Sequence, residues 1–339
     1  MNIGTNTKGK AMSNSHAKNY TILTVFLIIF SISYTSSIAG EYTMKISYET
    51  SDTHLKARTA LKFANRLKEL SKDRIEVKMF PNSSLIPSKQ EVTAALRGQV
   101  EAIMPFVSYY ESISASAKVF TMPMIFRDYS HISDAWNGAA GIAVSKDLDQ
   151  KGLIALGYWY DTPTHLFTTE KPISNLDQVA GMKIRTYPSA TLEATIEAFK
   201  AVPTVIPGSE VYLALQNGVA EGALTTPAFA ASLKLTDVLR HMTRLNLAYG
   251  GYIFAVNKKF YQKLPVDLQE AVALAAKEMT LWNKEAIKKE VAAAEQLMRD
   301  AGVAIHDLKA GDRNRWVSSV QPVVDQQSDA IKLLVKKVK

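Results

Sequence analysis

Polar and apolar residues alternate along two stretches near the beginning of the chain, residues 42–48 and 75–79. Such alternation is typical of β-strands that bury one face. Between them, apolar residues recur at three- and four-residue spacing over residues 60–70, which predicts an amphipathic helix. A second helix is predicted at residues 89–97 and a buried strand at 102–106. This order of strand, helix, strand, helix and strand predicts an α/β fold with a parallel sheet.

The same succession of strand and helix patterns begins again in the middle of the chain. It predicts strands at residues 153–160, 182–185 and 202–206, and helices at 190–199 and 209–217. A further strand, 252–257, is predicted to return to the first half. No linker rich in Pro, Gly or Ser separates the halves, so the crossing strands themselves are the predicted hinge. We therefore predict two lobes, the first with residues 40–163 and the returning strand, the second with residues 164–251.

The last quarter of the chain is predicted to be largely helical. Residues 266–301 contain neither Gly nor Pro and keep an apolar stripe. They predict one helix of about 50 Å, which is long enough to bridge two lobes. Residues 302–339 are predicted to add a short strand or turn and an amphipathic helix that pack on the lobes. We interpret the lysines of that helix as a solvated face rather than a membrane contact.

The first 39 residues have the order of a secretory signal peptide. A polar stretch with three lysines comes first, an apolar run of about eleven residues follows at 22–32, and small residues stand at Ser37 and Ala39. The apolar run is shorter than the roughly twenty residues that a transmembrane helix needs. We therefore predict residues 1–39 to be a cleaved signal peptide and the mature protein, from about Gly40, to be periplasmic.

The composition narrows the functional class. The 339 residues carry a formal net charge of +8, but basic and acidic residues are interleaved without a basic stripe, which argues against nucleic-acid binding. Cysteine is absent, which excludes disulfides, a lipoprotein anchor and thiol catalysis. The six histidines lack metal-ligand spacing, and no nucleophile elbow or phosphate-binding loop occurs. With export, this predicts a binding protein and not an enzyme, with no cofactor and no metal.

Four strings of the chain resemble one protein family. They are FTMPMIFRDY at residues 120–129, GMKIR at 181–185, SEVYLALQNGVAEG at 209–222 and NKKFYQKLPVDLQ at 257–269. They are similar, in the same order, to strings of the extracytoplasmic solute receptors of tripartite ATP-independent periplasmic (TRAP) transporters, the DctP family. The resemblance implies a two-lobed periplasmic-binding-protein fold with a long bridging helix. It also implies a small organic acid as ligand and the integral membrane subunits of a TRAP transporter as partners.

The resemblance also implies which residues of the second lobe bind substrate. The arginine of the second string, Arg185 here, holds the substrate carboxylate in the family, and its planar fork of donors suits that task. His165 stands nearest the position at which many members carry a second arginine, and it is equally compatible with a plain core histidine. Thr225 and Thr226 stand where an asparagine is usual. Tyr212, in the third string, is also predicted to bind substrate.

In the first lobe, Glu49 and the segment from Phe106 to Tyr110 fall where relatives contact substrate. Phe106, Tyr109 and Tyr110 would make that side of the site aromatic, although an aromatic stripe is more often core than pocket.

The predicted site has one arginine for a carboxylate, Arg185, which we call the carboxylate clamp, and much aromatic surface. It therefore predicts as ligand a monocarboxylate with an apolar or aromatic body. A C4-dicarboxylate is less favoured, because its second charge would be costly in a dry cleft. The chain is expected to act as a monomer. A periplasmic receptor for signalling, a receptor of an ABC importer, and a secreted enzyme on the same scaffold are the alternatives.

Overall fold

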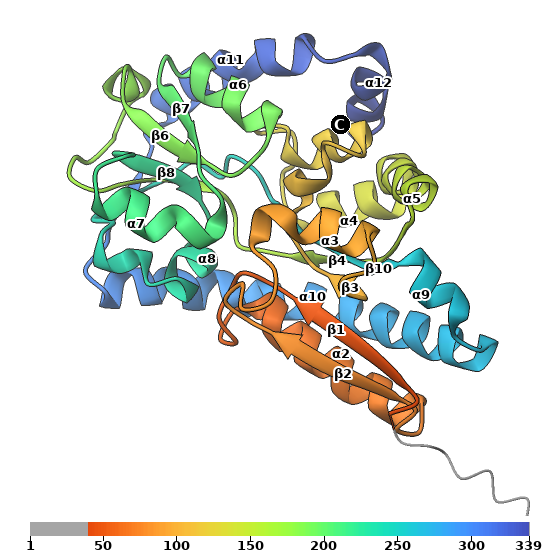
Figure 1. Cartoon of the computed structure of the whole chain (residues 1–339). Helices are drawn as coiled ribbons and strands as arrows, with labels where there is room; N and C mark the ends of the chain where they lie inside the picture. Colours follow the sequence, from red (N-terminus) through yellow and green to blue (C-terminus); the bar gives the residue numbers. More distant parts are fainter. Residues whose placement is uncertain (1–39, 339) are drawn as a thin grey trace, which may run out of the picture. The chain divides into compact units, whose positions relative to one another are not determined.

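The computed structural model describes residues 40–338, so the predicted signal peptide lies outside the described residues. Two mixed β-sheets form the framework of this part of the chain (Figure 1). The first has the strand order β2-β1-β3-β10-β4, and the second has the order β11-β9-β5-β8-β6-β7. The five-stranded sheet contains β1 (Tyr42–Ser47), β2 (Ile75–Phe80), β3 (Ala102–Ile103), β4 (Leu153–Tyr160) and β10 (Gly251–Asn257). The six-stranded sheet contains β5 (His165–Thr168), β6 (Lys183–Thr186), β7 (Val202–Val205), β8 (Gly222–Thr225), β9 (His241–Arg244) and β11 (Ala304–Asp307).

Each sheet is only partly parallel. Strand β1 is parallel to β2 and β3, as predicted, but β10 inserts between β3 and β4 and is antiparallel to both. Strand β5 is likewise antiparallel to β8 and β9. The chain passes from one sheet to the other three times, between β4 and β5, between β9 and β10, and between β10 and β11. On the second of these passages the return strand β10 enters the first sheet against its direction. The prediction of an α/β fold with crossing strands is confirmed. That the two sheets move as separate lobes stays a prediction.

The helices are divided between the two sheets. Those packed with the five-stranded sheet include α2 (Leu55–Leu70), α3 (Glu91–Leu96), α4 (Tyr129–Asn137), α5 (Ala139–Lys151) and α9 (Lys258–Lys263). Those packed with the six-stranded sheet are α6 (Ala190–Ala198), α7 (Val211–Gln216) and α8 (Pro227–Ser232).

The predicted long helix is present as α10 (Val266–Asp300), and its 35 residues span about 52 Å. It contacts α2 and β4 on one side and α8 and β11 on the other, so it bridges both sheets (Figure 1).

The carboxyl-terminal segment forms two helices instead of the single predicted one. Helix α11 (Ala310–Asp325) packs on α6, and α12 (Asp329–Val338) packs on α4 and α5. The break between them coincides with Ser328, whose hydroxyl accepts from the amide of Ile331 at 3.5 Å. None of the helices in residues 40–338 combines the length and the apolar character needed to cross a membrane.

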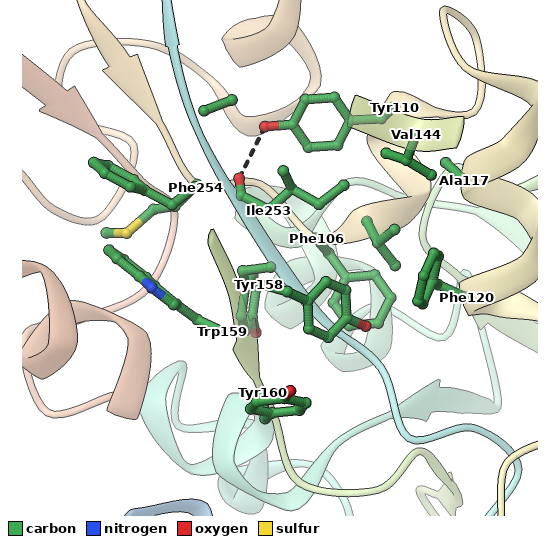
Figure 2. Close-up of a cluster of buried hydrophobic side chains, with 14 of the residues drawn as sticks. Phe106, Tyr110, Ala117, Phe120, Val144, Tyr158, Trp159, Tyr160, Ile253 and Phe254 are labelled. Atoms are coloured by element: carbon green, nitrogen blue, oxygen red, sulfur yellow. Dashed lines mark hydrogen bonds between the residues drawn. The ribbon is translucent and has the colours of Figure 1, made fainter. Parts of the chain in front are cut away.

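Aromatic residues fill the core beside each sheet. Trp159 of β4 stacks on Phe254 of β10 with ring centroids 4.7 Å apart. Trp316 of α11 meets Phe199 edge to face at 4.6 Å on the other side of the molecule. Figure 2 shows that Tyr110 belongs to the first of these cores, where its hydroxyl donates to the carbonyl oxygen of Ile253 at 2.9 Å.

Candidate solute-binding site

A cavity lies where the two strand crossings meet, and residues from both sheets line it. Its volume is about 320 Å³, and its walls are close together. The residues on the side of the five-stranded sheet, which we call the first wall, are Glu49, Phe106, Tyr109, Asp161 and Tyr252. The residues on the side of the six-stranded sheet, the second wall, are Arg185, Tyr187, Gly208, Thr225, Thr226 and Phe229. Most of them follow or end a strand, which is where α/β proteins place ligands.

Arg185 is the cation of the second wall. It lies on β6 between Thr204 of β7 and Ala223 of β8, and its side chain is only 1% exposed. Its Nε donates to the carbonyl oxygen of Ile206 at 2.9 Å, but its Nη1 has no hydrogen-bond partner. No carboxylate of the described residues lies within ion-pair distance of it. Burial lowers the pKa of the guanidinium, an effect that nearby Tyr109, Tyr187 and Glu49 oppose.

Glu49 of the first wall is already paired. Its Oε2 accepts from Nζ of Lys56 at 2.6 Å, and both side chains are buried. The same ammonium donates to the carbonyl oxygen of Met104 at 3.3 Å and lies 4.0 Å from the ring centroid of Tyr252. Glu91 lies behind this pair, and neither of its carboxyl oxygens has a hydrogen-bond partner. Burial, together with the charge of Glu49, raises the pKa of Glu91 well above its usual range.

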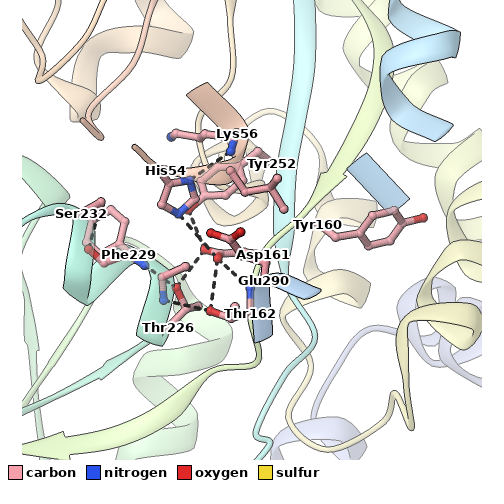
Figure 3. Close-up of polar contacts among 12 residues, drawn as sticks. His54, Lys56, Tyr160, Asp161, Thr162, Thr226, Phe229, Ser232, Tyr252 and Glu290 are labelled. Atoms are coloured by element: carbon pink, nitrogen blue, oxygen red, sulfur yellow. Dashed lines mark hydrogen bonds and ion pairs between the residues drawn. The ribbon is translucent and has the colours of Figure 1, made fainter. Parts of the chain in front are cut away.

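Asp161 connects the two walls through hydroxyl groups (Figure 3). Its Oδ2 accepts from the hydroxyl of Tyr252 at 2.7 Å and from that of Thr226 at 2.9 Å. Its Oδ1 accepts from the amide of Thr162 at 2.7 Å and lies 3.6 Å from Nε2 of His54. Burial alone would raise the pKa of Asp161, but His54 and the donated hydrogen bonds lower it by more. This carboxyl group is therefore ionised and well supplied with donors.

Aromatic rings make up much of the remaining surface. Phe106 lies 4.6 Å from Tyr187 of the second wall and 5.6 Å from Tyr252, measured between ring centroids. The hydroxyl of Tyr109 accepts from the amide of Gly208 at 3.4 Å, which joins the two walls. Burial, and then the charge of Glu49, raises the pKa of Tyr109 to about 12, so this hydroxyl is protonated at neutral pH.

Further contacts join the two sides at the rim of the cavity. Glu111 accepts from the hydroxyls of Ser189 and Thr121, both at 2.7 Å. Lys89 and Glu210 form an exposed ion pair at 3.5 Å. Because exposed ion pairs contribute little, the Lys89–Glu210 pair adds little to the hydrogen bond between Ser189 and Glu111.

Comparison with known proteins assigns the chain to a family. Residues 46–330 match the family described as bacterial extracellular solute-binding protein, family 7, or DctP. The chain belongs to this family. It is therefore a solute receptor and not an enzyme, and the family relationship to TRAP-transporter receptors that the four strings indicated is confirmed.

Individual DctP-family relatives cover almost all of the described chain. The C4-dicarboxylate-binding periplasmic protein DctP of Rhodobacter capsulatus is 32% identical over 297 residues, which are 87% of this chain and 89% of that protein. The crystal structure of a TRAP periplasmic solute-binding protein from Sulfurospirillum deleyianum with bound succinate has a TM-score of 0.83 and 32% identity, and covers 88% of this chain and 98% of that one. The sugar acid binding protein DctPAm from Advenella mimigardefordensis, in complex with galactonate, has a TM-score of 0.85 at 22% identity over 88% of this chain and 97% of that one, and shows the shared fold.

The structure brings six of the nine predicted substrate-binding residues to the cavity of this DctP-family protein. They are Arg185, Glu49, Phe106, Tyr109, Thr225 and Thr226. The other three do not line the cavity. Tyr110 points into the core, because consecutive side chains of the 3₁₀-helix η2 (Val107–Tyr110) are turned by about 120° from one another. Tyr212, on α7, packs half-buried against the core of the six-stranded sheet.

His165 is also displaced from the cavity, although it lies on β5 opposite Thr225. Its Nδ1 accepts from the amide of Asn246 at 3.2 Å. Burial, with the charge of Arg244, lowers its pKa to about 3, so the ring is neutral throughout the physiological range. Of the two alternatives for this residue, the structure favours the core histidine.

Five lining residues were missed by the sequence analysis: Asp161, Tyr187, Gly208, Phe229 and Tyr252. Asp161 and Tyr187 each directly follow a strand, a position that could have marked them as candidates. Gly208 had no such signal, because its role depends on its neighbours: a Cβ there would lie 2.9 Å from Cζ of Phe229 and 3.3 Å from Cγ of Glu49. No group of three or more potential metal ligands occurs within residues 40–338.

Proposed function

We propose that this protein is the periplasmic receptor of a TRAP-type transporter and that it binds a small organic acid through Arg185. The observation that carries the proposal is the buried guanidinium whose Nη1 lacks a partner. A buried charge is costly unless a counter-charge and hydrogen bonds compensate it. A solute carboxylate supplies both, and an arginine can bind it with two parallel hydrogen bonds.

The charges of the lining support a monocarboxylate with an apolar or aromatic body. Arg185 is the one cation among the lining residues, whereas Glu49 and Asp161 are acidic. A second carboxylate on the solute would face these acids without a cation of its own. The rings of Phe106 and Tyr187 offer apolar surface instead.

A C4-dicarboxylate is the second candidate, and the relatives favour it. The Rhodobacter capsulatus protein is named for such ligands, and the Sulfurospirillum deleyianum structure contains succinate. The membrane subunits of a transporter are the proposed partners of the ligand-bound receptor, and residues 1–39 are its proposed export signal. A signalling receptor would have the same cavity, so the cavity does not discriminate between these partners.

The test measures binding of organic acids to the purified receptor by calorimetry and thermal unfolding. The panel contains benzoate, phenylacetate, succinate and galactonate. A ligand at one hundred times its Kd stabilises the protein by about 2.7 kcal/mol, which raises Tm by roughly two degrees or more. Arg185→Met should weaken binding by about thirtyfold or more, because the carboxylate loses a charged partner in a dry site.

Two controls make the result specific. Arg97→Met makes the same change at an exposed arginine outside the cavity and should leave the affinity unchanged. The unfolding free energy of ligand-free Arg185→Met should stay within about 1 kcal/mol of wild type or rise, because the change removes an unpaired buried charge. Equal binding by wild type and Arg185→Met would overturn the carboxylate clamp. If succinate binds more tightly than every monocarboxylate, the proposed preference for a monocarboxylate is wrong, but the role of Arg185 stands.

A further inference from the structure

The hydroxyl groups of the cavity have fixed proton directions. Tyr252 and Thr226 each carry a single hydroxyl proton, and both hydroxyls lie within hydrogen-bond distance of the same oxygen, Oδ2 of Asp161. An ionised carboxylate can only accept, so each hydroxyl must donate its proton to Asp161. What these two hydroxyls can offer to a solute is therefore lone pairs.

The protonation state of Asp161 is supported by its surroundings. His54 caps helix α2 by accepting the amide proton of Lys56 on Nδ1 at 3.1 Å, so the ring is neutral with its proton on Nε2. That proton faces Oδ1 of Asp161 at 3.6 Å, and the amide of Thr162 donates to the same oxygen. Every group that a dashed line joins to the Asp161 carboxyl group in Figure 3 is thus a donor, which favours its ionised form.

Another residue of the lining also offers the solute only hydrogen-bond acceptors. Glu49 is paired with Lys56 and can only accept. The hydroxyl of Thr226 already accepts from the amide of Phe229 at 3.2 Å, which leaves one lone pair. Arg185 on the second wall, in contrast, can only donate. The lining therefore offers a solute a donor at Arg185 and acceptors at Tyr252, Thr226 and Glu49.

We propose that Asp161 determines specificity by holding the hydroxyl protons of Tyr252 and Thr226 away from the cavity. The site then selects a monocarboxylate that carries a hydrogen-bond donor, a hydroxyl or an ammonium group, on its body. This inference rests on the proposed function and adds to it a requirement on the body of the solute, beyond the carboxylate that Arg185 binds. A second carboxylate is rejected because lone pairs face it, and a bare hydrocarbon is disfavoured because it leaves buried acceptors unpaired.

Butanoate and its derivatives test this without a change in chain length. Butanoate has a bare body, succinate has a second carboxylate, 4-aminobutanoate has an ammonium group, and the 2-, 3- and 4-hydroxybutanoates place a hydroxyl at each carbon. We expect at least one donor-bearing acid to bind about tenfold more tightly than butanoate, and more tightly than succinate. The amino and hydroxy acids show which donor the site takes.

Two variants of the protein test whether the preference for donor-bearing acids depends on Tyr252 and Asp161. Tyr252→Phe removes one acceptor and should reduce the preference for the donor-bearing acid over butanoate severalfold. In Asp161→Asn the donors at the Oδ1 position keep the amide oxygen there, so the NH2 group faces the two hydroxyls, which then accept from it and turn their protons elsewhere. We expect this variant to gain affinity for succinate relative to the hydroxy acid by about tenfold. Tyr110→Phe makes the same change as Tyr252→Phe in the core and should leave all ratios unchanged.

The outcomes separate this inference from the proposed function. If butanoate binds as tightly as every donor-bearing derivative, yet binding still requires Arg185, the carboxylate clamp stands and the role of Asp161 is wrong. If the affinities of Tyr252→Phe for the donor-bearing acids relative to butanoate equal those of wild type, the role of Asp161 is also wrong. This variant keeps the inference testable if Asp161→Asn does not fold. If none of these acids or the larger panel binds, both proposals fall.

Discussion

Two buried cations flank the cavity, and their surroundings differ in one respect. Lys56, behind the first wall, is 0% exposed and has the carboxylate of Glu49 at 2.6 Å, a carbonyl oxygen and an aromatic ring as partners. Arg185, in the second wall, is 1% exposed and has a carbonyl oxygen and the ring of Tyr187. It has no carboxylate. The first cation is compensated by the protein, and the second is left for a ligand to compensate.

This difference shows how one fold can use a buried charge in two ways. The Lys56–Glu49 pair contributes to the folded state, because removal of either partner would leave the other charge buried alone. The unpaired Arg185 makes the ligand-free state less favourable than it would otherwise be. A solute carboxylate removes that cost, so part of the binding free energy is set in advance by the fold. The following variants test this contrast, from the largest expected effect to the smallest.

Lys56→Met should destabilise the protein by about 3–5 kcal/mol, because Glu49 would remain buried without a counter-charge. Urea unfolding of the ligand-free protein measures the loss. Lys62→Met, on the exposed face of the same helix, is the matched control; it loses only a contact between the ammonium and the ring of Trp282 and should change stability by no more than about 1 kcal/mol. Adding Glu49→Gln to Lys56→Met should recover part of the loss. A loss below about 1 kcal/mol for Lys56→Met would contradict the contrast with Arg185.

Glu91→Gln should change how stability depends on pH. The folded pKa of Glu91 is raised above its ordinary value of 4.5, first by burial and then by Glu49. Between the unfolded and folded pKa values the folded state therefore binds more protons than the unfolded state, and its stability falls as pH rises, by at most about 1.4 kcal/mol per pH unit. The glutamine variant lacks this slope. We expect it to gain stability relative to wild type from pH 5 towards pH 8, measured by urea unfolding at each pH.

Parallel stability curves for the two proteins would show that Glu91 does not keep its proton on folding. Lys56 would then be shared between two ionised carboxylates, and the first wall would carry more negative charge than we infer. The same experiment on Glu76→Gln, at an exposed position of β2, should give parallel curves and so serves as the control.

Gly208→Ala should weaken ligand binding by about tenfold or less, because its Cβ would enter the narrow space between Phe229 and Glu49. Phe229 is a side chain that can shift, which limits the effect. Gly311→Ala is the control, since a Cβ there would have no atom within 4 Å. Calorimetry measures both variants. An affinity equal to that of wild type would show that the walls do not need to approach this closely when a solute is bound.

The elements of the fold were predictable to the extent that their signals are local. The 35 residues of α10 carry a continuous apolar stripe without Gly or Pro, and the structure begins the helix at the predicted residue, Val266. The antiparallel entry of β10 was not predicted, because strand periodicity does not contain direction. The break at Ser328 was missed because α11 and α12 share one amphipathic pattern.

The candidate site was predictable only in part, for a similar reason. Arg185 was found through a short string of residues, and its burial follows from its place on β6 between two other strands. Tyr109 and Tyr110 are neighbours in sequence, yet one lines the cavity and the other fills the core, and only the packing around η2 decides which. Asp161 acquires its partners from β8 and β10, which are distant in sequence.

The positions of the tryptophans have a spectroscopic consequence. The chain has four tryptophans, at residues 136, 159, 282 and 316, and none lines the cavity. Trp159 instead reports on the packing of β4 against β10, and Trp316 on the packing of α11 against α6. A change in tryptophan fluorescence on addition of solute would therefore signal a rearrangement of the protein and not contact with the solute. Tyrosine absorbance would report the contact itself, so the two signals followed together can time solute capture against the motion that accompanies it.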